Sequence, residues 1–295
     1  MTYPQIAAFA RLANGDVAPT RAIAGQTTKL VRDSHDIYYD ETNDEIVVAS
    51  AFGQAILYYR GAANGDEPPA RILQGPHTQI QMPGYGIYVD GVHNETFLME
   101  GRDRPGEEYI MVFPRNAKGD VAPLRVIKGP DTMLKDARSI AVDPVRNLIA
   151  VASRNGMLIF NRTDNGNVKP RAVIQGVPNN NFRILVSKGY IIAGAGGTGD
   201  GDGGRRGGAR GAEGGGAEAG GGRGNAAGPR AVMRIWSITD NGRVPPLFEV
   251  RSPSGAGAGG GALGGGRIAL NPKEKEIIIG GGQGVSIYSL PELFD

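Results

Sequence analysis

Residues 64–75 read NGDEPPARILQG, and close copies of this stretch recur along the chain. The copies are NGDVAPTRAIAG at 14–25, KGDVAPLRVIKG at 118–129 and NGNVKPRAVIQG at 165–176, with a worn copy, NGRVPPLFEV, at 241–250. Asn-Gly and Gly-Asp favour tight turns because they adopt positive φ at low cost. The proline after each turn lacks an amide donor and suits the start of an edge strand. Each copy therefore predicts a turn that leads into the outermost strand of a sheet.

A second element recurs in step with the first. It reads DIYYD at 36–40, GIYVD at 86–90, SIAVD at 139–143, RILVS at 183–187 and RIALN at 267–271. The first full unit shows four short strands, a to d, at 37–39, 45–49, 55–59 and 70–73. Four antiparallel strands every ~40–50 residues are typical of the blades of a β-propeller. The sequence therefore predicts an all-β protein, a β-propeller of four-stranded antiparallel blades that forms a single domain over residues 1–295.

The strand count leaves the number of blades open at five or six. Strands a and b recur in five repeat units, whereas residues 5–25 supply only a half unit, strands c and d, and the C-terminal unit reaches PELFD without a strand d. In a five-bladed ring the N-terminal strand d would complete the C-terminal blade. In a six-bladed ring a further a–b pair would lie upstream of Met1. Alternatively, the spare edges pair with another copy of the chain, because exposed strand edges bind further strands.

The GIYVD strand, followed by a short turn and a strand such as EIVVA at 45–49, resembles the NHL-repeat propellers and related bacterial six-bladed propellers. The gluconolactonase-like and streptogramin-lyase-like proteins are among these relatives. The resemblance covers nearly the whole chain outside its glycine-rich stretches. It implies the fold, and it leaves the function between lactonase, lyase and a protein- or RNA-binding platform. It also implies that Asp40, Asp90 and Asp143 cap the a–b turns through backbone amides.

The composition excludes several classes of protein. A net charge of +2 over 295 residues gives no global field that would recruit nucleic acid or a membrane. The absence of cysteine excludes disulfides and thiolate zinc sites. No apolar run approaches the ~18 residues that span a bilayer, and the N-terminus lacks the pattern of a signal peptide. The compartment stays open, because the resemblance implies export if the chain continues upstream.

Two glycine-rich stretches interrupt the repeats at 195–229 and 252–266. The first is predicted in a b–c loop and the second in a d–a loop, and these loops share one face of a propeller. The first is either a neutral expansion or a lid or partner-contact loop over the channel. Its arginines resemble those of segments that bind single-stranded nucleic acid, but acids cancel their charge and no aromatic residue offers a stacking surface. Asp200 and Asp202 are weak candidates for calcium, and no other cofactor is expected.

Charged and aromatic residues recur where the inner strands begin, at the mouth of the expected channel. This predicted ligand site comprises His35, Asp36, Tyr85, Arg138, Arg183 and Arg267, with His77 in a nearby d–a connection. Converging guanidinium groups repel one another unless an anion or carboxylates lie between them, and their planar forks bind carboxylate or phosphate. The sequence therefore leaves two interpretations open. The arginines either form ion pairs with acids such as Asp36, Asp136 or Glu100, or they bind an anionic ligand.

The residues favour a binding platform over an enzyme. No glutamate stands where an inner strand begins, and a ring of cations disfavours a divalent metal. No Ser-His-Asp order, zinc spacing or phosphate loop stands out. We expect a non-catalytic propeller that binds a small anionic molecule or a protein segment at its channel mouth, or that assembles with its own copies by strand exchange. The alternative is a metal-dependent lactonase-like hydrolase or a lyase with its site in the same channel.

Overall fold

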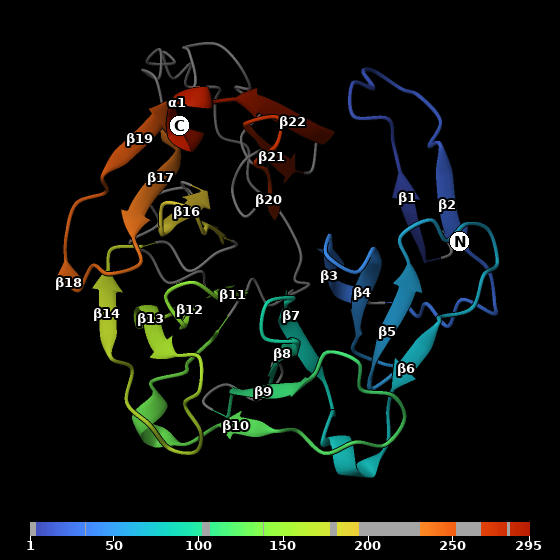
Figure 1. The fold of residues 1–295 in the computed structure, drawn as a ribbon, viewed down its shortest axis with the longest axis horizontal. Coiled ribbons are helices and arrows are strands. Elements are labelled where there is room, and N and C mark those ends of the chain that lie inside the picture. The colour runs from blue at the N-terminus through green and yellow to red at the C-terminus, as the bar shows by residue number, and fades with distance from the viewer. Residues whose placement is uncertain are drawn as a thin grey trace, which may run out of the picture.

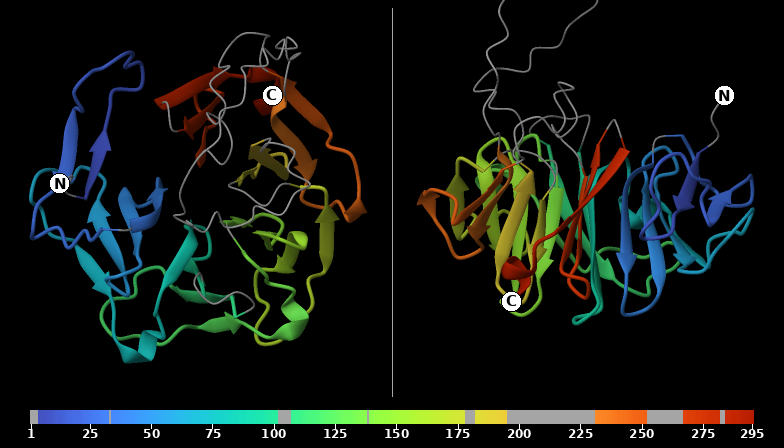
Figure 2. Two further views of the ribbon diagram at one scale, coloured as in Figure 1. Left: turned by 180° about the vertical axis from the view of Figure 1, so that it is seen from behind. Right: turned by 90° about the horizontal axis from the view of Figure 1, so that it is seen from above.

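The computed structural model describes residues 4–32, 34–101, 107–137, 139–177, 182–194, 231–251, 267–281 and 284–295. These residues form a ring of β-sheets, seen face-on in Figure 1 and from behind and from above in Figure 2. In the described ranges helix is confined to two short 3-10 turns, η1 (Pro76–Thr78) and η2 (Pro130–Thr132), and to α1 (Pro291–Phe294). None of them has the length and apolar character of a membrane-spanning helix.

Five blades make up the ring, each starting at its inner strand. The first blade contains β3 (Ser34–Asp40), β4 (Glu45–Ser50), β5 (Ala55–Arg60) and β6 (Arg71–Leu73). The second contains β7 (Pro83–Asp90), β8 (Glu95–Glu100), β9 (Tyr109–Pro114) and β10 (Arg125–Ile127). The third contains β11 (Ser139–Asp143), β12 (Leu148–Ser153), β13 (Gly156–Asn161) and β14 (Ala172–Gln175), and β18 (Gly242–Arg243) pairs in parallel with β14.

The fourth blade contains β15 (Phe182–Leu185), β16 (Tyr190–Gly194), β17 (Ala231–Ser237) and β19 (Phe248–Arg251). The fifth has three strands, β20 (Arg267–Asn271), β21 (Glu276–Gly281) and β22 (Gly284–Ser289). The glycine-rich stretches 195–229 and 252–266 fall between β16 and β17 and between β19 and β20, and both lie outside the described residues. The predicted all-β propeller of antiparallel blades is confirmed.

The N-terminal half unit forms a sheet of its own, β1 (Gln5–Ala8) with β2 (Arg21–Ala24). The five-bladed closure, in which the N-terminal strand d would complete the C-terminal blade, is not formed. Instead β2 pairs with β1, with Ile23 opposite Ile6. Among the described strands, β22 pairs with β21 alone. The hairpin forms because its two strands are joined by a short connection, so their pairing closes only a small loop.

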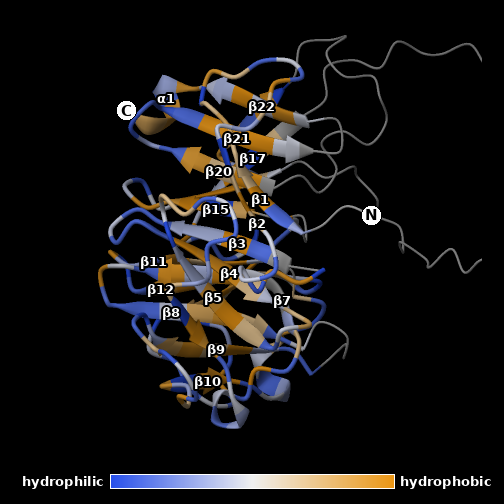
Figure 3. Cartoon of the chain, turned by 90° about the vertical axis from the view of Figure 1, so that its right-hand side faces the viewer, coloured by the Kyte–Doolittle hydropathy of each residue, from blue (hydrophilic) through white to orange (hydrophobic). Residues whose placement is uncertain are grey.

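The apolar core lies between neighbouring blades. In the interface of the first two blades, Val47, Ile56 and Tyr58 pack against Ile87 and Val89. Side chains alternate along a strand, so residues two apart share one face of a blade and meet the same neighbour. Figure 3 shows the apolar residues concentrated on the strands. Each blade is therefore stabilised by the blades on either side of it.

The a–b turns are capped by aspartate, as the resemblance implies. Oδ1 of Asp40 accepts hydrogen bonds from the amides of Thr42 at 3.2 Å and Asn43 at 3.3 Å. Asp90 and Asp143 accept the corresponding amides in the next two blades. These aspartates therefore fix the turns that end the inner strands.

Four of the five copies of the repeated Asn-Gly-Asp turn join their sheet to the sheet before it. We call the residues at these three positions the blade latch. In the latch at 64–66, Gly65 pairs in parallel with Ile23, and Oδ1 of Asn64 accepts the amide of Ala22 at 3.1 Å. The latches at 118–120, 165–167 and 241–242 make corresponding contacts with the preceding sheets. The most regular motif of the sequence is thus an inter-blade contact.

The third latch residue explains the glycine that ends each repeated stretch. Oδ1 of Asp66 accepts the amide of Thr27 at 2.7 Å. To reach it, the chain passes through Gly25 at φ 134°, where a Cβ would lie 2.3 Å from Cγ of Asp66. Asp120 and Asn167 occupy the same place opposite Gly75 and Gly129. Only glycine combines this backbone angle with so close an approach.

Buried Glu–Arg clusters form a second inter-blade contact. Glu95, at the start of β8, receives Nη2 of Arg125 from its own blade at 2.8 Å and Nη1 of Arg162 from the next blade at 2.5 Å. Glu45 makes the same pair of contacts one blade earlier, with Arg71 and Arg115. One carboxylate thus ties a strand d to the neighbouring blade.

Candidate functional site

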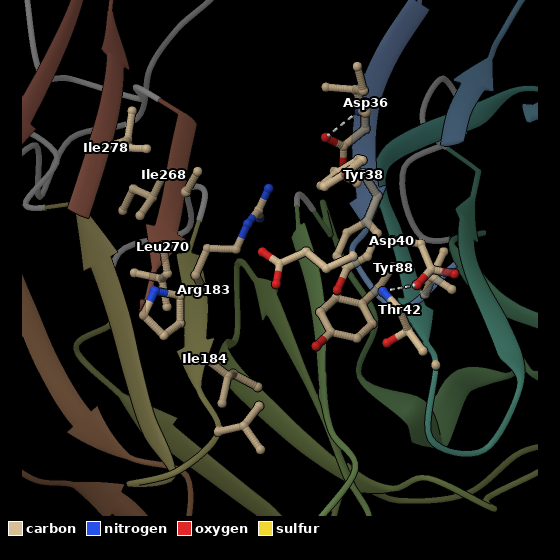
Figure 4. A pocket seen from close by; sticks show the side chains of 18 of the residues that line it. Asp36, Tyr38, Asp40, Thr42, Tyr88, Arg183, Ile184, Ile268, Leu270 and Ile278 are labelled. Atoms are coloured by element: carbon tan, nitrogen blue, oxygen red, sulfur yellow. Dashed lines mark hydrogen bonds between the residues drawn. The ribbon is translucent and has the colours of Figure 1, made fainter. Parts of the chain in front are cut away.

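A cavity of about 1040 Å³ occupies the centre of the ring. The inner strands β3, β7, β15 and β20 line it, together with β1 and parts of β21 and β22. Figure 4 shows Tyr38 and Tyr88 on one side and Ile184, Ile268 and Leu270 on the other. The cavity therefore has an aromatic wall and an aliphatic wall.

Arg183 brings a positive charge into this cavity. Its register at the start of β15 places it among the lining residues, and Figure 4 shows its side chain extending toward the aromatic wall. Its Nη1 donates to the carbonyl oxygen of Phe182 at 2.9 Å, and no carboxylate of the described residues lies within ion-pair distance of it. Most of its hydrogen-bonding capacity is thus directed at the cavity, since a guanidinium carries five N–H donors.

The aromatic wall consists of two tyrosines at the same register of neighbouring inner strands. The ring centroids of Tyr38 and Tyr88 are 4.7 Å apart, with an angle of 53° between the planes. Burial raises the pKa of Tyr38 well above its usual range and also raises the pKa of Tyr88, while the nearby Arg183 charge lowers both. Both phenols are therefore neutral at physiological pH, and the guanidinium is close enough to act on both.

Asp36 lines the same cavity, but its carboxylate serves the fold. It is buried, and its Oδ1 accepts the amide of Ile37 at 3.0 Å while its Oδ2 accepts the amide of Ile87 at 3.0 Å. The second bond joins inner strand β3 to inner strand β7. Asp36 therefore positions the tyrosine-bearing strands relative to each other.

His77 lies away from the cavity. It belongs to η1, at the outer edge of the ring in Figure 1, where its ring Nδ1 is 2.6 Å from Oδ2 of Asp120. Its amide also donates to the same carboxylate at 2.7 Å. The structure thus places His77 against the blade latch at 118–120, and it does not bring the residue together with Asp36 and Arg183.

The other predicted ligand residues are not described at the level of their side chains. Arg138, Asp200 and Asp202 lie outside the described residues, as do the side chains of His35, Tyr85 and Arg267. Of the acids considered as alternative partners, Asp136 pairs with Arg154 at 3.5 Å, and Glu100 accepts the amide of Met82 at 2.9 Å. In the described part of the chain, no group of three or more His, Asp or Glu side chains could hold a metal ion.

The sequence prediction missed the tyrosine wall. Tyr38 and Tyr88 occupy the third position of DIYYD and GIYVD, so their shared register was visible in the repeat. Aromatic residues at that position were assigned to no role because strand patterns alone do not separate a blade interface from the channel wall. In the structure β3 and β7 are inner strands, and this position places the two tyrosines on the channel wall.

Comparison with known proteins agrees with the fold. No protein-family model and no curated protein matched the sequence. The structure is similar to the β-propeller domain of Cps50 (Swd1) from Myceliophteria thermophila, with a TM-score of 0.52 and 11% identity over 90% of this chain and 69% of that one.

It is also similar to a functionally unknown protein from Desulfotomaculum acetoxidans, with a TM-score of 0.51 and 14% identity over 93% of this chain and 73% of that one. Identities this low establish the fold and nothing narrower. By its own sheets and by these neighbours, the chain is a β-propeller, and its described residues form five blades besides the β1–β2 sheet.

Proposed function

We propose that this protein is a non-catalytic binding platform whose central cavity takes a small anionic molecule with a carboxylate or phosphate group. The observation that carries the proposal is the Arg183 guanidinium, which extends into the cavity without a carboxylate partner among the described residues. Such a group gains most from a ligand that offers two oxygens to its planar fork.

The walls of the cavity support the same ligand class. The phenol of Tyr38 donates to that of Tyr88, so the neutral Tyr88 hydroxyl can donate a hydrogen bond to a second oxygen of the ligand, and both rings offer an apolar surface. The aliphatic wall of Ile268 and Leu270 suits the carbon skeleton of the ligand. The cavity is also lined by the carboxylates of Asp36, Asp40, Glu41 and Asp90, and a combination of placed polar groups with apolar walls is typical of small-molecule sites.

Thermal denaturation with citrate, phosphate and galacturonate tests the proposal. Binding at about 100 Kd adds about 2.7 kcal/mol, which corresponds to a Tm rise of several degrees for a chain of this size. We expect at least one of these anions to raise Tm, and Arg183→Ala to abolish the rise. Arg154→Ala is the matched control, because Arg154 is an exposed arginine outside the cavity. A rise that survives Arg183→Ala would contradict the proposal.

The rival function is a metal-dependent lactonase or lyase, which rests on the resemblance to gluconolactonase-like propellers. The cavity is lined by Asp36, Asp40 and Asp90, the kind of residue such a site uses, yet each of the three already accepts backbone amides. Elemental analysis of the purified protein and a panel of lactones separate the two functions. A stoichiometric divalent metal with lactone turnover would establish the enzyme, whereas we expect neither.

A further inference from the structure

The inner strand β3 exposes apolar side chains that the next blades bury. Ile37 is 45% exposed and Tyr39 is 50% exposed, whereas the same positions of β7, Ile87 and Val89, are 2% and 4% exposed. The difference arises because β7 packs against a complete neighbouring blade, and β3 has only the two-stranded sheet of β1 and β2 beside it. The face of the first blade that is directed toward β1 and β2 is therefore partly uncovered at β3.

Strand β22 exposes the matching surface at the other end of the repeat. Val285 is 70% exposed and Ile287 is 42% exposed, whereas the corresponding residues of β5, Ile56 and Tyr58, are fully buried. In the first blade these positions pack on the inner strands of the second blade. Figure 1 shows β22 and β3 on the same side of the ring as the β1–β2 hairpin. Ile37 and Val285 both line the central cavity, and we call the side of the cavity between β3 and β22 the open sector.

An ion pair shows which positions of a blade β1 and β2 occupy, and therefore which strands are missing beside them. Nη1 of Arg11, which follows β1, lies 2.6 Å from Oε1 of Glu276 at the start of β21. Arg115 makes the same contact with Glu45 across the first blade interface. Sheet β1–β2 therefore holds the c and d positions of the blade that follows β20–β22. Glu45 also binds Arg71 of its own strand d, and the fifth blade has no such strand among the described residues.

The first blade latch is also unused. Asn14, Gly15 and Asp16 repeat the latch sequence, but none of them makes a hydrogen bond to another described residue. In the other latches the partner is a strand d of the preceding blade. The partner of this latch would be a strand d next to β22. The latch, the ion pair and the exposed side chains thus indicate the same three missing strands. One is a strand d that would pair with β22, and the other two are strands a and b that would complete the sheet of β1 and β2.

We propose that the open sector binds a polypeptide segment of this same repeat pattern, with its strands in the order d, a, b, so that its strand b lies beside β1. Such a segment would place a glycine-ended strand d on the latch at 14–16 and an arginine on Glu276, and its a–b pair would cover Ile37 and Val285. A second copy of the chain fits less well, because its described d–a–b runs are already paired within its own blades.

A fused chain tests this directly. Tyr109 and Gln5 hold the same register at the start of strand c, so residues 70–108 are duplicated immediately ahead of Gln5. We expect a Tm rise of more than about 5 °C, since each kcal/mol shifts Tm by about 2–4 °C at this size. We also expect slower amide hydrogen exchange in 5–8 and 284–289, where an unpaired edge gains a neighbour.

The latch supplies the matched control. Asp16→Ala should leave Tm unchanged in the 295-residue chain, where Asp16 has no described partner, and should remove a measurable part of the rise in the fused chain. Both readouts are made without any added anion, so failure of the anion site and failure of this proposal are distinguishable.

A second arm keeps the proposal open to refutation if the fused chain misfolds. A synthetic peptide with the sequence of residues 70–100 is added to the 295-residue chain, and exchange in 284–289 is measured again. Protection that depends on the peptide and weakens with Asp16→Ala supports the proposal. Unchanged exchange in both arms overturns the proposal. It is also overturned if light scattering shows a dimer and hydrogen exchange shows that 284–289 is already protected in that dimer without any added segment.

Discussion

Glu95→Ala should lower the free energy of unfolding by about 3–5 kcal/mol, the cost of breaking a buried ion pair by removing one partner. The carboxylate of Glu95 lies between the guanidinium groups of Arg125 and Arg162, and all three side chains are largely buried. Without it, two positive charges face each other in a poorly solvated interface. Urea unfolding followed by Trp236 fluorescence measures the effect, because the single tryptophan is fully buried.

The comparison for Glu95 is an exposed ion pair of the same chemistry. Glu67 receives two hydrogen bonds from Arg60, at 2.8 and 2.9 Å, but the arginine side chain is mostly exposed. Exposed pairs contribute little because water and salt screen them. We expect Glu67→Ala to leave the midpoint of urea unfolding nearly unchanged. Equal losses from Glu67→Ala and Glu95→Ala would show that burial of the cluster does not set its contribution.

Strands and turns were predictable because their signals are local. Strand b of the first unit was expected at 45–49 and is found at Glu45–Ser50, since a short apolar run bounded by turn residues needs no distant partner to be recognised. The blade latch shows the limit of that reasoning. The sequence reveals that Asn64 and Asp66 recur, but their partners, Ala22 and Thr27, lie about forty residues away and follow only from the packing of two sheets.

The candidate site was predictable in register and not in role. The start of each inner strand indicated Asp36 and Arg183, which both line the cavity, and their role as ligand residues stays a prediction. Whether a charge in that register is directed at solvent, at an amide or at another side chain depends on the neighbouring blade, and Asp36 turns out to bind the amide of Ile87. His77 was misplaced for a similar reason, because a 3-10 turn in its d–a connection carries it to Asp120 at the rim.

The interface of the third and fourth blades links stability to the site. Trp236→Ala should lower the free energy of unfolding by about 3–5 kcal/mol, the range for truncating a buried aromatic side chain to alanine. Trp236 is 1% exposed and shares a buried cluster with Phe182, Ile191 and Met157. Its removal leaves a cavity in this cluster, and only part of that cavity can close by relaxation. Urea unfolding followed by circular dichroism measures the loss, since the variant has no tryptophan.

Phe248→Ala is the control for this loss, because Phe248 lies in the same blade but is 50% exposed. It should cost far less than Trp236→Ala, and Trp236→Phe should fall between the two because most of the apolar volume remains. Trp236→Ala should also weaken any anion-dependent rise in Tm. Phe182 precedes Arg183 on β15 and accepts its hydrogen bond, so loosening the packing of Phe182 frees the guanidinium to leave its position in the cavity. An anion response that stays intact in a destabilised Trp236→Ala protein would mean that Arg183 is held in place by something other than this core.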